Sequence, residues 1–126
     1  MEKPRINIFI VDDDRDILRL YSSYFEMNGL NIVGTANNGI DAVNKLTDSI
    51  PKPDVIIIDY HMPKINGIET SKLILKIDKS FKIVMISGDR TVRKKALSSG
   101  IYDFYEKSNN LKKLCHKIRA IVNKSE

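Results

Sequence analysis

The chain has 126 residues, which is enough for one domain with a substantial apolar core, and its composition of 42% hydrophobic and 29% charged residues is ordinary for a globular protein. No apolar run is long enough to span a membrane or to act as a signal peptide, and the single cysteine excludes an internal disulfide. We therefore expect a soluble protein of the reducing cytoplasm.

The net charge of +5 is unevenly distributed along the chain. Residues 1–81 hold 10 Lys and Arg against 12 Asp and Glu, whereas residues 82–126 hold 11 against 4. A basic C-terminal third suggests an acidic protein partner or nucleic acid, although a solvated helix face is a commoner reason for such a run.

Five apolar segments alternate with five amphipathic ones. The expected strands are 6–11, 31–35, 54–58, 82–87 and 102–106. Three of them are almost continuously apolar, as strands that are covered on both faces must be. The expected helices have apolar residues that recur on one face, namely Ile17, Leu18, Tyr21, Tyr24 and Phe25; Gly39, Val43 and Leu46; Ile68, Ser71, Ile74 and Leu75; Val92, Ala96 and Leu97; and Leu111, Leu114, Cys115, Ile118, Ile121 and Val122.

Strict alternation of strands and helices predicts a parallel α/β sheet with helices on both faces. In such a sheet, ligands bind outside the carboxyl ends of the strands. Asp12, Asp13 and Asp59 all fall at strand ends, Ser87 ends the fourth expected strand, and Lys107 follows the fifth. We therefore expect these five polar side chains to line one edge of the sheet.

Carboxylates that lie close together resist ionisation unless a cation compensates them. Mg²⁺ prefers oxygen ligands and typically binds one or two carboxylates together with a phosphate. Asp13 suits a direct ligand and Asp12 one that acts through water, while Asp59 could attack a phosphorus atom. Lys107 would neutralise charge on the transferred group, and Ser87 could donate a hydrogen bond to it.

Each of these residues also has an ordinary structural interpretation. Asp14 and Asp16 fit the start of a helix, where acidic side chains cap free N–H groups. Taken alone, Asp12 and Asp13 could be caps as well. The phosphoryl-transfer hypothesis depends on the joint pattern, because four strand ends carry the required groups together.

Four sequence segments resemble the receiver domains of two-component response regulators, of the single-domain chemotaxis (CheY-like) type. These segments are "IVDDD", "IIIDYHMPKINGIE", "IVMISG" and "SGIYDFYEKS". They place Asp59 at the phosphoacceptor position, Ser87 at the switch hydroxyl, Phe104 at the switch aromatic and Lys107 at the family's lysine. The resemblance covers residues 1–126 as one receiver domain. It implies a flavodoxin-like, doubly wound sheet of strand order 2-1-3-4-5 with five helices.

The resemblance also implies a chemistry, which is that of a phosphoacceptor rather than an enzyme. A sensor histidine kinase or a phosphotransfer protein would donate a phosphoryl group to Asp59 in the presence of Mg²⁺, with Mn²⁺ as a substitute. The ion would be held by Asp13, Asp59 and the backbone carbonyl of His61, with Asp12 in its outer shell.

The implied consequence of phosphorylation is a switch. Ser87 would move toward the phosphoryl group, and Phe104 would rotate inward into the vacated space. That movement would alter the surface formed by the fourth helix, the fifth strand and the fifth helix. Water would finally hydrolyse the acyl phosphate, at a rate that His61 and Asp89 would tune.

Two residues depart from the family pattern. Ser108 follows Lys107, where the family usually has a proline after a cis peptide bond. Because a non-proline cis bond costs about 2.5–4 kcal/mol, we expect a trans bond and a loop that differs from the family pattern. Gly88 replaces a more usual alanine and is expected to loosen the loop after the fourth strand.

The last two expected helices are strongly basic, with Arg90, Arg93, Lys94 and Lys95 near the start of one and Lys112, Lys113, Lys117 and Arg119 on the other. Two such faces would repel each other in a symmetric dimer. We therefore expect a monomer, or a dimer through another surface, in both phosphorylation states. We also expect an acidic protein target and no membrane contact, and direct nucleic-acid binding by the basic residues is the weaker alternative.

Three other functions remain open from the sequence. The chain could be an interaction module that works without phosphorylation, an intermediate in a phosphorelay, or a small Mg²⁺-dependent phosphohydrolase. The complete set of reactive residues argues against the first. The absence of an insertion that could form a substrate pocket argues against the last.

Overall fold

The structure is a computed structural model that describes residues 5–108 and 110–124. Its five parallel strands form one sheet in the order β2-β1-β3-β4-β5. The strands are β1 (Asn7–Val11), β2 (Asn31–Ala36), β3 (Val55–Asp59), β4 (Ile83–Ser87) and β5 (Asp103–Glu106). The order confirms the flavodoxin-like arrangement, and every strand boundary lies within one residue of its expected position.

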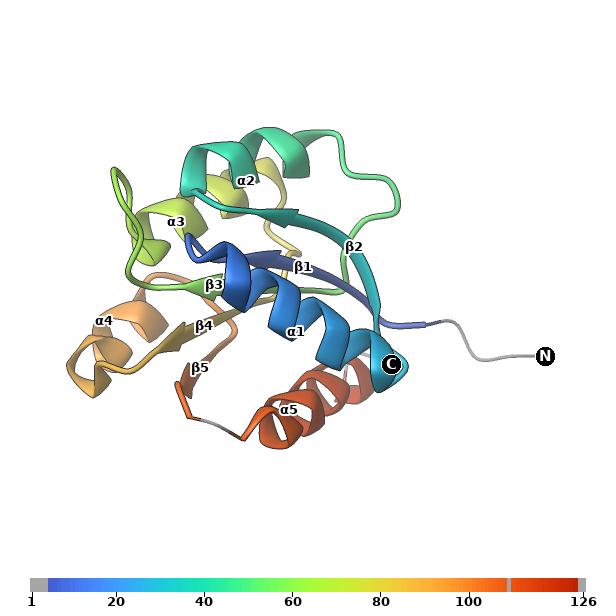
Figure 1. Cartoon of the computed structure of the whole chain (residues 1–126). Coiled ribbons are helices and arrows are strands. Elements are labelled where there is room, and N and C mark those ends of the chain that lie inside the picture. The colour runs from blue at the N-terminus through green and yellow to red at the C-terminus, as the bar shows by residue number, and fades with distance from the viewer. Residues whose placement is uncertain (1–4, 109, 125–126) are drawn as a thin grey trace.

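Helices cover both faces of the sheet (Figure 1). They are α1 (Arg15–Met27), α2 (Gly39–Thr47), α3 (Gly67–Ile77), α4 (Arg93–Ser98) and α5 (Leu111–Lys124), and a short 3₁₀ turn, η1 (Arg90–Val92), precedes α4. Helices α1 and α5 pack on one face of the sheet, whereas α2, α3 and α4 pack on the other.

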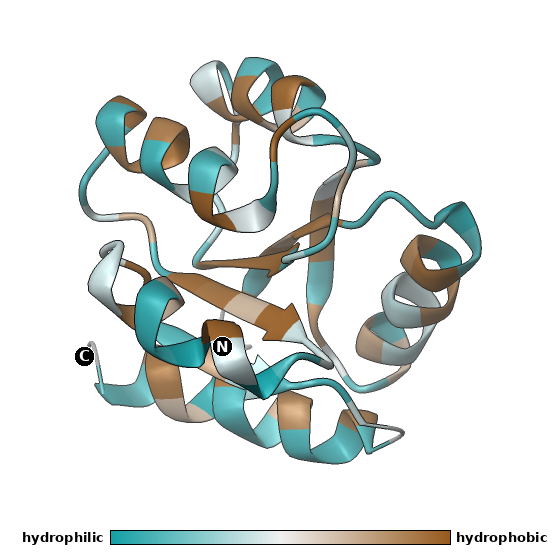
Figure 2. Cartoon of the chain, turned by 90° about the vertical axis from the view of Figure 1, so that its left-hand side faces the viewer, coloured by the Kyte–Doolittle hydropathy of each residue, from teal (hydrophilic) through white to brown (hydrophobic). Residues whose placement is uncertain are grey.

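Alternate residues of each strand enter the two apolar layers. In β1, Ile8 and Ile10 belong to the layer beneath α1 and α5, and Phe9 and Val11 to the layer on the opposite face. Both sets are buried, which explains why the strands read as continuous apolar runs. Figure 2 shows hydrophobic strands in the interior and hydrophilic stretches on the helices that surround them.

Two helical faces differ from the expected ones. In α2 the buried residues are Gly39, Ala42 and Leu46, whereas Val43 is only half-buried. Of the expected apolar face of the fourth helix, Ala96 is buried in α4, and Val92 packs against the same apolar layer from η1. The prediction is wrong for Leu97, which is 37% exposed. A helix of six residues is too short to bury a longer stripe.

Among the residues that the structure describes, no helix combines the length and the apolar character that crossing a bilayer requires.

Candidate functional site

The carboxyl end of β1 turns directly into α1 through three aspartates. Asp12 is buried, with 4% of its surface exposed, and its Oδ1 accepts a hydrogen bond from the backbone N–H of Asp14 at 2.9 Å. Asp14 in turn accepts hydrogen bonds from the N–H groups of Asp16 and Ile17. The expected helix-capping role of Asp14 is therefore confirmed, and Asp13 is left exposed between two anchored neighbours.

The carboxyl end of β3 is Asp59, which is 7% exposed. The loop that follows it returns at Gly67, whose N–H donates to the carbonyl of Tyr60 at 2.8 Å. A Cβ atom on Gly67 would lie 2.7 Å from the carbonyl oxygen of Asp59, closer than Cβ atoms approach other atoms. Only glycine lets α3 begin this close to the end of β3.

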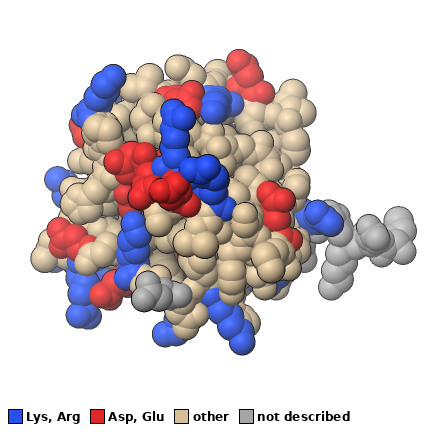
Figure 3. All heavy atoms as spheres, viewed as in Figure 1, with Lys and Arg blue, Asp and Glu red and all other residues tan. Residues whose placement is uncertain are grey.

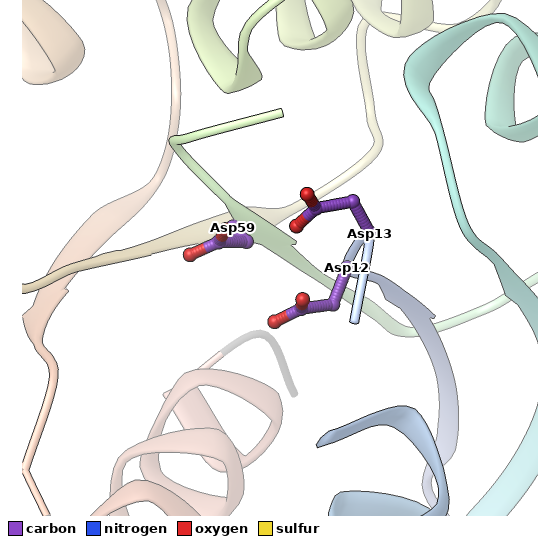
Figure 4. Close-up of side chains that lie close together, drawn as sticks. All are labelled: Asp12, Asp13 and Asp59. Atoms are coloured by element: carbon purple, nitrogen blue, oxygen red, sulfur yellow. The ribbon is translucent and has the colours of Figure 1, made fainter. Parts of the chain in front are cut away.

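Because β1 and β3 pair side by side, their ends bring three carboxylates together. Each of Asp12, Asp13 and Asp59 offers one oxygen, and these oxygens all lie within 4.8 Å of one another. Figure 4 shows the three carboxylates extending to the same side of the strand ends. The Nζ atom of Lys107, which follows β5, is 3.8 Å from Oδ1 of Asp59. We call the three aspartates the acidic cluster.

Burial and mutual repulsion disfavour the charged forms of Asp12 and Asp59. The pKa of Asp59 is raised to about 6, mainly by burial and next by the charge of Asp12, while Lys107 partly offsets the rise. The pKa of Asp12 is also raised, again chiefly by burial. Three close carboxylates with one ammonium beside them are short of positive charge. A hard divalent cation such as Mg²⁺ therefore fits this set of oxygen donors.

Ser87 ends β4, which pairs with β3, and is 1% exposed. Its Oγ accepts a hydrogen bond from the N–H of Asp89 at 3.0 Å, so that the hydroxyl proton can be donated elsewhere. Its carbonyl accepts a hydrogen bond from the N–H of Lys107 at 2.8 Å. One residue thus connects the loop after β4 with the loop after β5.

His61 and Asp89 stand at the rim of the site. His61 is exposed, and its ring meets that of Tyr60 edge-on at a centroid distance of 4.7 Å. The carboxylate of Asp89 accepts hydrogen bonds from the side chain and the backbone of Thr91, and these bonds lower its pKa. Asp89 therefore caps η1 with its charged form.

Phe104 lies in the interior of the protein. The resemblance implies a side chain that rotates inward on phosphorylation, but here Phe104 is already buried, with 4% of its surface exposed. It belongs to the apolar layer beneath α2, α3 and α4, and it pairs with Met85 across β4 and β5. The hydrophobic interior accepts this ring in the present structure, and its rotation on phosphorylation stays a prediction.

The loop after β5 has the expected trans geometry. Within the described residues, the one cis peptide bond joins Ile50 and Pro51, so the bond between Lys107 and Ser108 is trans. The Ser108 hydroxyl lies 3.1 Å from that of Tyr105, a contact that no sequence pattern predicted.

Two acidic residues of β5 pair with basic residues of neighbouring elements. These pairs were missed from the sequence because only the charges of the last two expected helices were considered. Asp103 accepts a hydrogen bond from Lys117 of α5 at 2.8 Å, and Glu106 lies 3.3 Å from Arg90 of η1. Figure 3 shows a separate group of acidic side chains where α1 begins, with basic side chains beside it. The C-terminal basic surface is therefore partly neutralised from within the fold.

A surface hollow opens beside the acidic cluster and gives solutes access to it. Its lining residues come from the loop after β1 and from the segment between β3 and α3, and they are Asp13, Tyr60, His61, Met62, Pro63 and Asn66. Its open shape suits contact with another molecule's surface better than capture of a small substrate.

Comparison with known proteins gives a consistent result. A family model described as the response regulator receiver domain matches residues 8–119. The transcriptional regulatory protein CpxR homolog of Haemophilus influenzae is 36% identical over 120 residues, which are 94% of this chain and 51% of that protein. The chemotaxis protein CheY of Treponema pallidum is 31% identical over 117 residues, 91% of this chain and 81% of that protein. The chain thus spans about half the length of the CpxR-type relatives that it matches.

Solved structures give the same result. A chain in the CheX–CheY–BeF₃–Mg²⁺ complex from Borrelia burgdorferi has a TM-score of 0.85 and 30% identity, with 92% of this chain and 88% of that chain covered. The response regulator TrrA of Thermotoga maritima, solved with Mg²⁺ and BeF, has a TM-score of 0.83 and 30% identity, with 91% of this chain and 97% of that chain covered.

Proposed function

The chain belongs to the response regulator receiver domain family of two-component signalling systems, and on this premise we propose that Asp59 is its phosphoacceptor. The supporting observation is the acidic cluster, in which Asp59 lies beside two other carboxylates and 3.8 Å from the ammonium of Lys107. Receiver domains are signalling domains rather than classical enzymes. The proposed reaction is therefore the transfer of a phosphoryl group to Asp59, which alters the protein's own surface.

In the proposed reaction, a carboxylate oxygen of Asp59 attacks the phosphorus atom of a phosphohistidine on a sensor kinase or phosphotransfer protein. The new O–P bond forms as the P–N bond breaks, and the electron pair stays on the donor imidazole. Lys107 offsets the negative charge of the transferred group, and the Ser87 hydroxyl donates a hydrogen bond to one of its oxygens. The open hollow beside Asp13 is where the donor protein would approach.

Mg²⁺, or Mn²⁺ in its place, is proposed to be held by Asp13, Asp59 and the backbone carbonyl of His61, with Asp12 contributing through water. The bound ion would supply the positive charge that the three carboxylates and the phosphoryl oxygens lack. Asp12 suits an outer role because its Oδ1 is already engaged by the N–H of Asp14.

The proposed switch begins at Ser87. When its hydroxyl is drawn toward the phosphoryl group, the hydrogen bond from Asp89 to Ser87 Oγ moves with it, and this bond connects Ser87 to η1 and α4. Phe104 is proposed to stabilise the shifted loop from its buried position. His61 and Asp89 flank the acceptor and are proposed to set how readily water hydrolyses the acyl phosphate.

Intact mass after incubation with acetyl phosphate and Mg²⁺ tests this proposal. We expect one phosphoryl adduct that disappears in the Asp59→Asn variant and when the metal is removed. Asp48→Asn, which alters an exposed aspartate at the end of α2, should leave the adduct in place. An unmodified mass under all conditions, together with failure to bind beryllofluoride, would favour a module that binds its partner without phosphorylation.

We further propose an acidic protein target for the basic face, defined as Arg93, Lys94, Lys95, Lys112 and Lys113. These side chains are exposed, and none forms an ion pair with any acid in residues 5–108 and 110–124. Complementary charge mainly accelerates association and selects partners, and its effect falls as salt is added.

The combined change Lys94→Glu and Lys95→Glu tests this assignment. Binding of a polyglutamate peptide should fall at low salt, whereas Lys72→Glu with Lys76→Glu on α3 should have a smaller effect. Retention of duplex DNA with a steep salt dependence would instead identify nucleic acid as the partner. Sedimentation is expected to show a monomer with and without beryllofluoride, because two such faces repel each other.

A further inference from the structure

Three hydrogen bonds close over the segment between β5 and α5. The Tyr105 hydroxyl donates to the carbonyl of Asn110 at 2.7 Å and lies 3.1 Å from the Ser108 hydroxyl, which accepts the N–H of Asn110 at 3.2 Å. Because the single proton of Tyr105 is used on Asn110, the proton between the two hydroxyls comes from Ser108. Each of the three hydrogen bonds therefore has one donor and one acceptor. We call these bonds among Tyr105, Ser108 and Asn110 the loop network.

The loop network is fixed to two rigid elements. Tyr105 lies in β5, is 7% exposed and packs in the same apolar layer as Leu114 of α5. Asn110 precedes α5, and its side chain accepts the N–H of Lys113 at 3.2 Å, so it also caps that helix. A rotation of the loop would therefore break a buried tyrosine's hydrogen bonds and disturb the start of a helix.

Lys107 lies between two anchored points of the backbone. Its own N–H donates to the carbonyl of Ser87 at 2.8 Å, and the loop network begins with the next residue, Ser108. The Lys107 side chain is 38% exposed and reaches Asp59 across 3.8 Å. A half-exposed lysine has many rotamers, so its ammonium stays beside one carboxylate only if the backbone beneath it is held in place.

We propose that Tyr105, Ser108 and Asn110 are positioning residues that hold Lys107 beside Asp59, an inference that rests on the proposed role of Asp59 as phosphoacceptor. They touch neither the phosphoryl group nor the acidic cluster and act through the backbone of Lys107. Hydrogen bonds from Ser108 supply the rigidity that a proline ring would supply at this position through its fixed φ.

The test compares Tyr105→Phe and Ser108→Ala with the unaltered chain in the rate of phosphorylation by acetyl phosphate at saturating Mg²⁺. We expect each change to slow the reaction roughly three- to tenfold, since each removes hydrogen bonds but no reactive group. Ser108→Thr keeps the hydroxyl and should restore the rate. Tyr102→Phe is the matched control, because Tyr102 is 46% exposed and lies outside the network.

The decisive arm repeats both changes in a Lys107→Ala background. A positioning role predicts no further slowing there, because the ammonium on which the network acts is absent. Further slowing in that background would mean that the network supports the whole site, and the proposal would fail. Rates equal to that of the unaltered chain in both variants would also overturn it.

Hydrogen exchange separates this inference from the proposed function. Both variants should exchange the amides of Lys107 and Asn110 faster than the unaltered chain, with the amides of β1 and β3 unchanged. If the unaltered chain takes up no phosphoryl group, the proposed function fails by itself. The exchange rates then still decide the network, because equal rates would show that Tyr105 and Ser108 do not hold this loop.

Discussion

Strand β3 contains two kinds of buried residue. The residues from Val55 to Ile58 are apolar and at most 1% exposed, whereas Asp59 is buried almost as completely but carries a carboxylate. For the apolar residues, burial removes hydrocarbon from water and stabilises the fold. For Asp59, burial raises the pKa to about 6 and disfavours the charged form. Burial of the apolar residues of β3 therefore stabilises the fold, whereas burial of the Asp59 carboxylate at the end of the strand destabilises it.

The largest effect is expected in the interior of the strand. Ile57→Ala removes a side chain that is 1% exposed, and it should lower the free energy of unfolding by about 2–5 kcal/mol. Ile40 of α2 is 49% exposed, so Ile40→Ala is the matched control and should cost much less. Urea denaturation of the three proteins measures the difference. Equal costs would mean that the interior of β3 is not where the stability lies.

Binding of Mg²⁺ at the acidic cluster should stabilise the folded protein. At a Mg²⁺ concentration of about 100 times the dissociation constant, binding to the folded state alone adds about 2.7 kcal/mol. We expect the melting temperature of the unaltered chain to rise with Mg²⁺ in calorimetry, and that of Asp59→Asn to rise much less. A melting temperature that ignores the metal would contradict the cation site.

Removing the charge of Asp59 should stabilise the metal-free protein at neutral pH. A pKa raised from 3.8 to about 6 corresponds to a cost of about 1–3 kcal/mol for ionising Asp59 in the folded state, which Asp59→Asn would relieve. The folded state holds the proton more tightly than the unfolded chain does. The cost therefore appears as the pH rises from about 4 through 6, and it is absent below that window. The gain should shrink as the pH falls toward 4, which urea denaturation of both proteins at several pH values measures.

The smallest effect concerns an aspartate at the same edge with the opposite role. Asp14 is exposed and accepts hydrogen bonds from two N–H groups of α1, so Asp14→Ala should lower the free energy of unfolding by about 1 kcal/mol. Thermal unfolding at low Mg²⁺ would show Asp14→Ala below the unaltered chain and Asp59→Asn above it. Shifts of the same sign would mean that burial does not separate the two aspartates.

The sequence predicted the strand ends well because each apolar run stops at a charged or polar residue, as at Asp12 and Asp59. Their convergence followed from the parallel arrangement, and the structure confirms it. The strand order could not be derived from periodicity, because it depends on which distant segments pair in the sheet. It was taken from the resemblance to receiver domains, and the structure has the same order.

Other features depend on contacts that no local pattern reveals. The loop network joins Tyr105 to Ser108 and Asn110 through side-chain hydrogen bonds, and short polar residues after a strand are too common to predict such contacts. The burial of Phe104 depends on space within the opposite apolar layer. The exposure of Leu97 was misjudged because half of the six residues of α4 are basic, which leaves the hydrophobic period too weak to locate a buried face.

The outer edge of β2 has a consequence for solubility. An edge strand presents unpaired backbone groups, which can recruit strands of other molecules and start aggregation. Here Lys45 donates a hydrogen bond to the carbonyl of Thr35 at 2.8 Å, and the register of β2 against β1 shifts by one residue between Ile8 and Phe9. A lysine over the edge and an irregular ladder both oppose the docking of a foreign strand. The β2 edge is thereby protected against amyloid-like assembly.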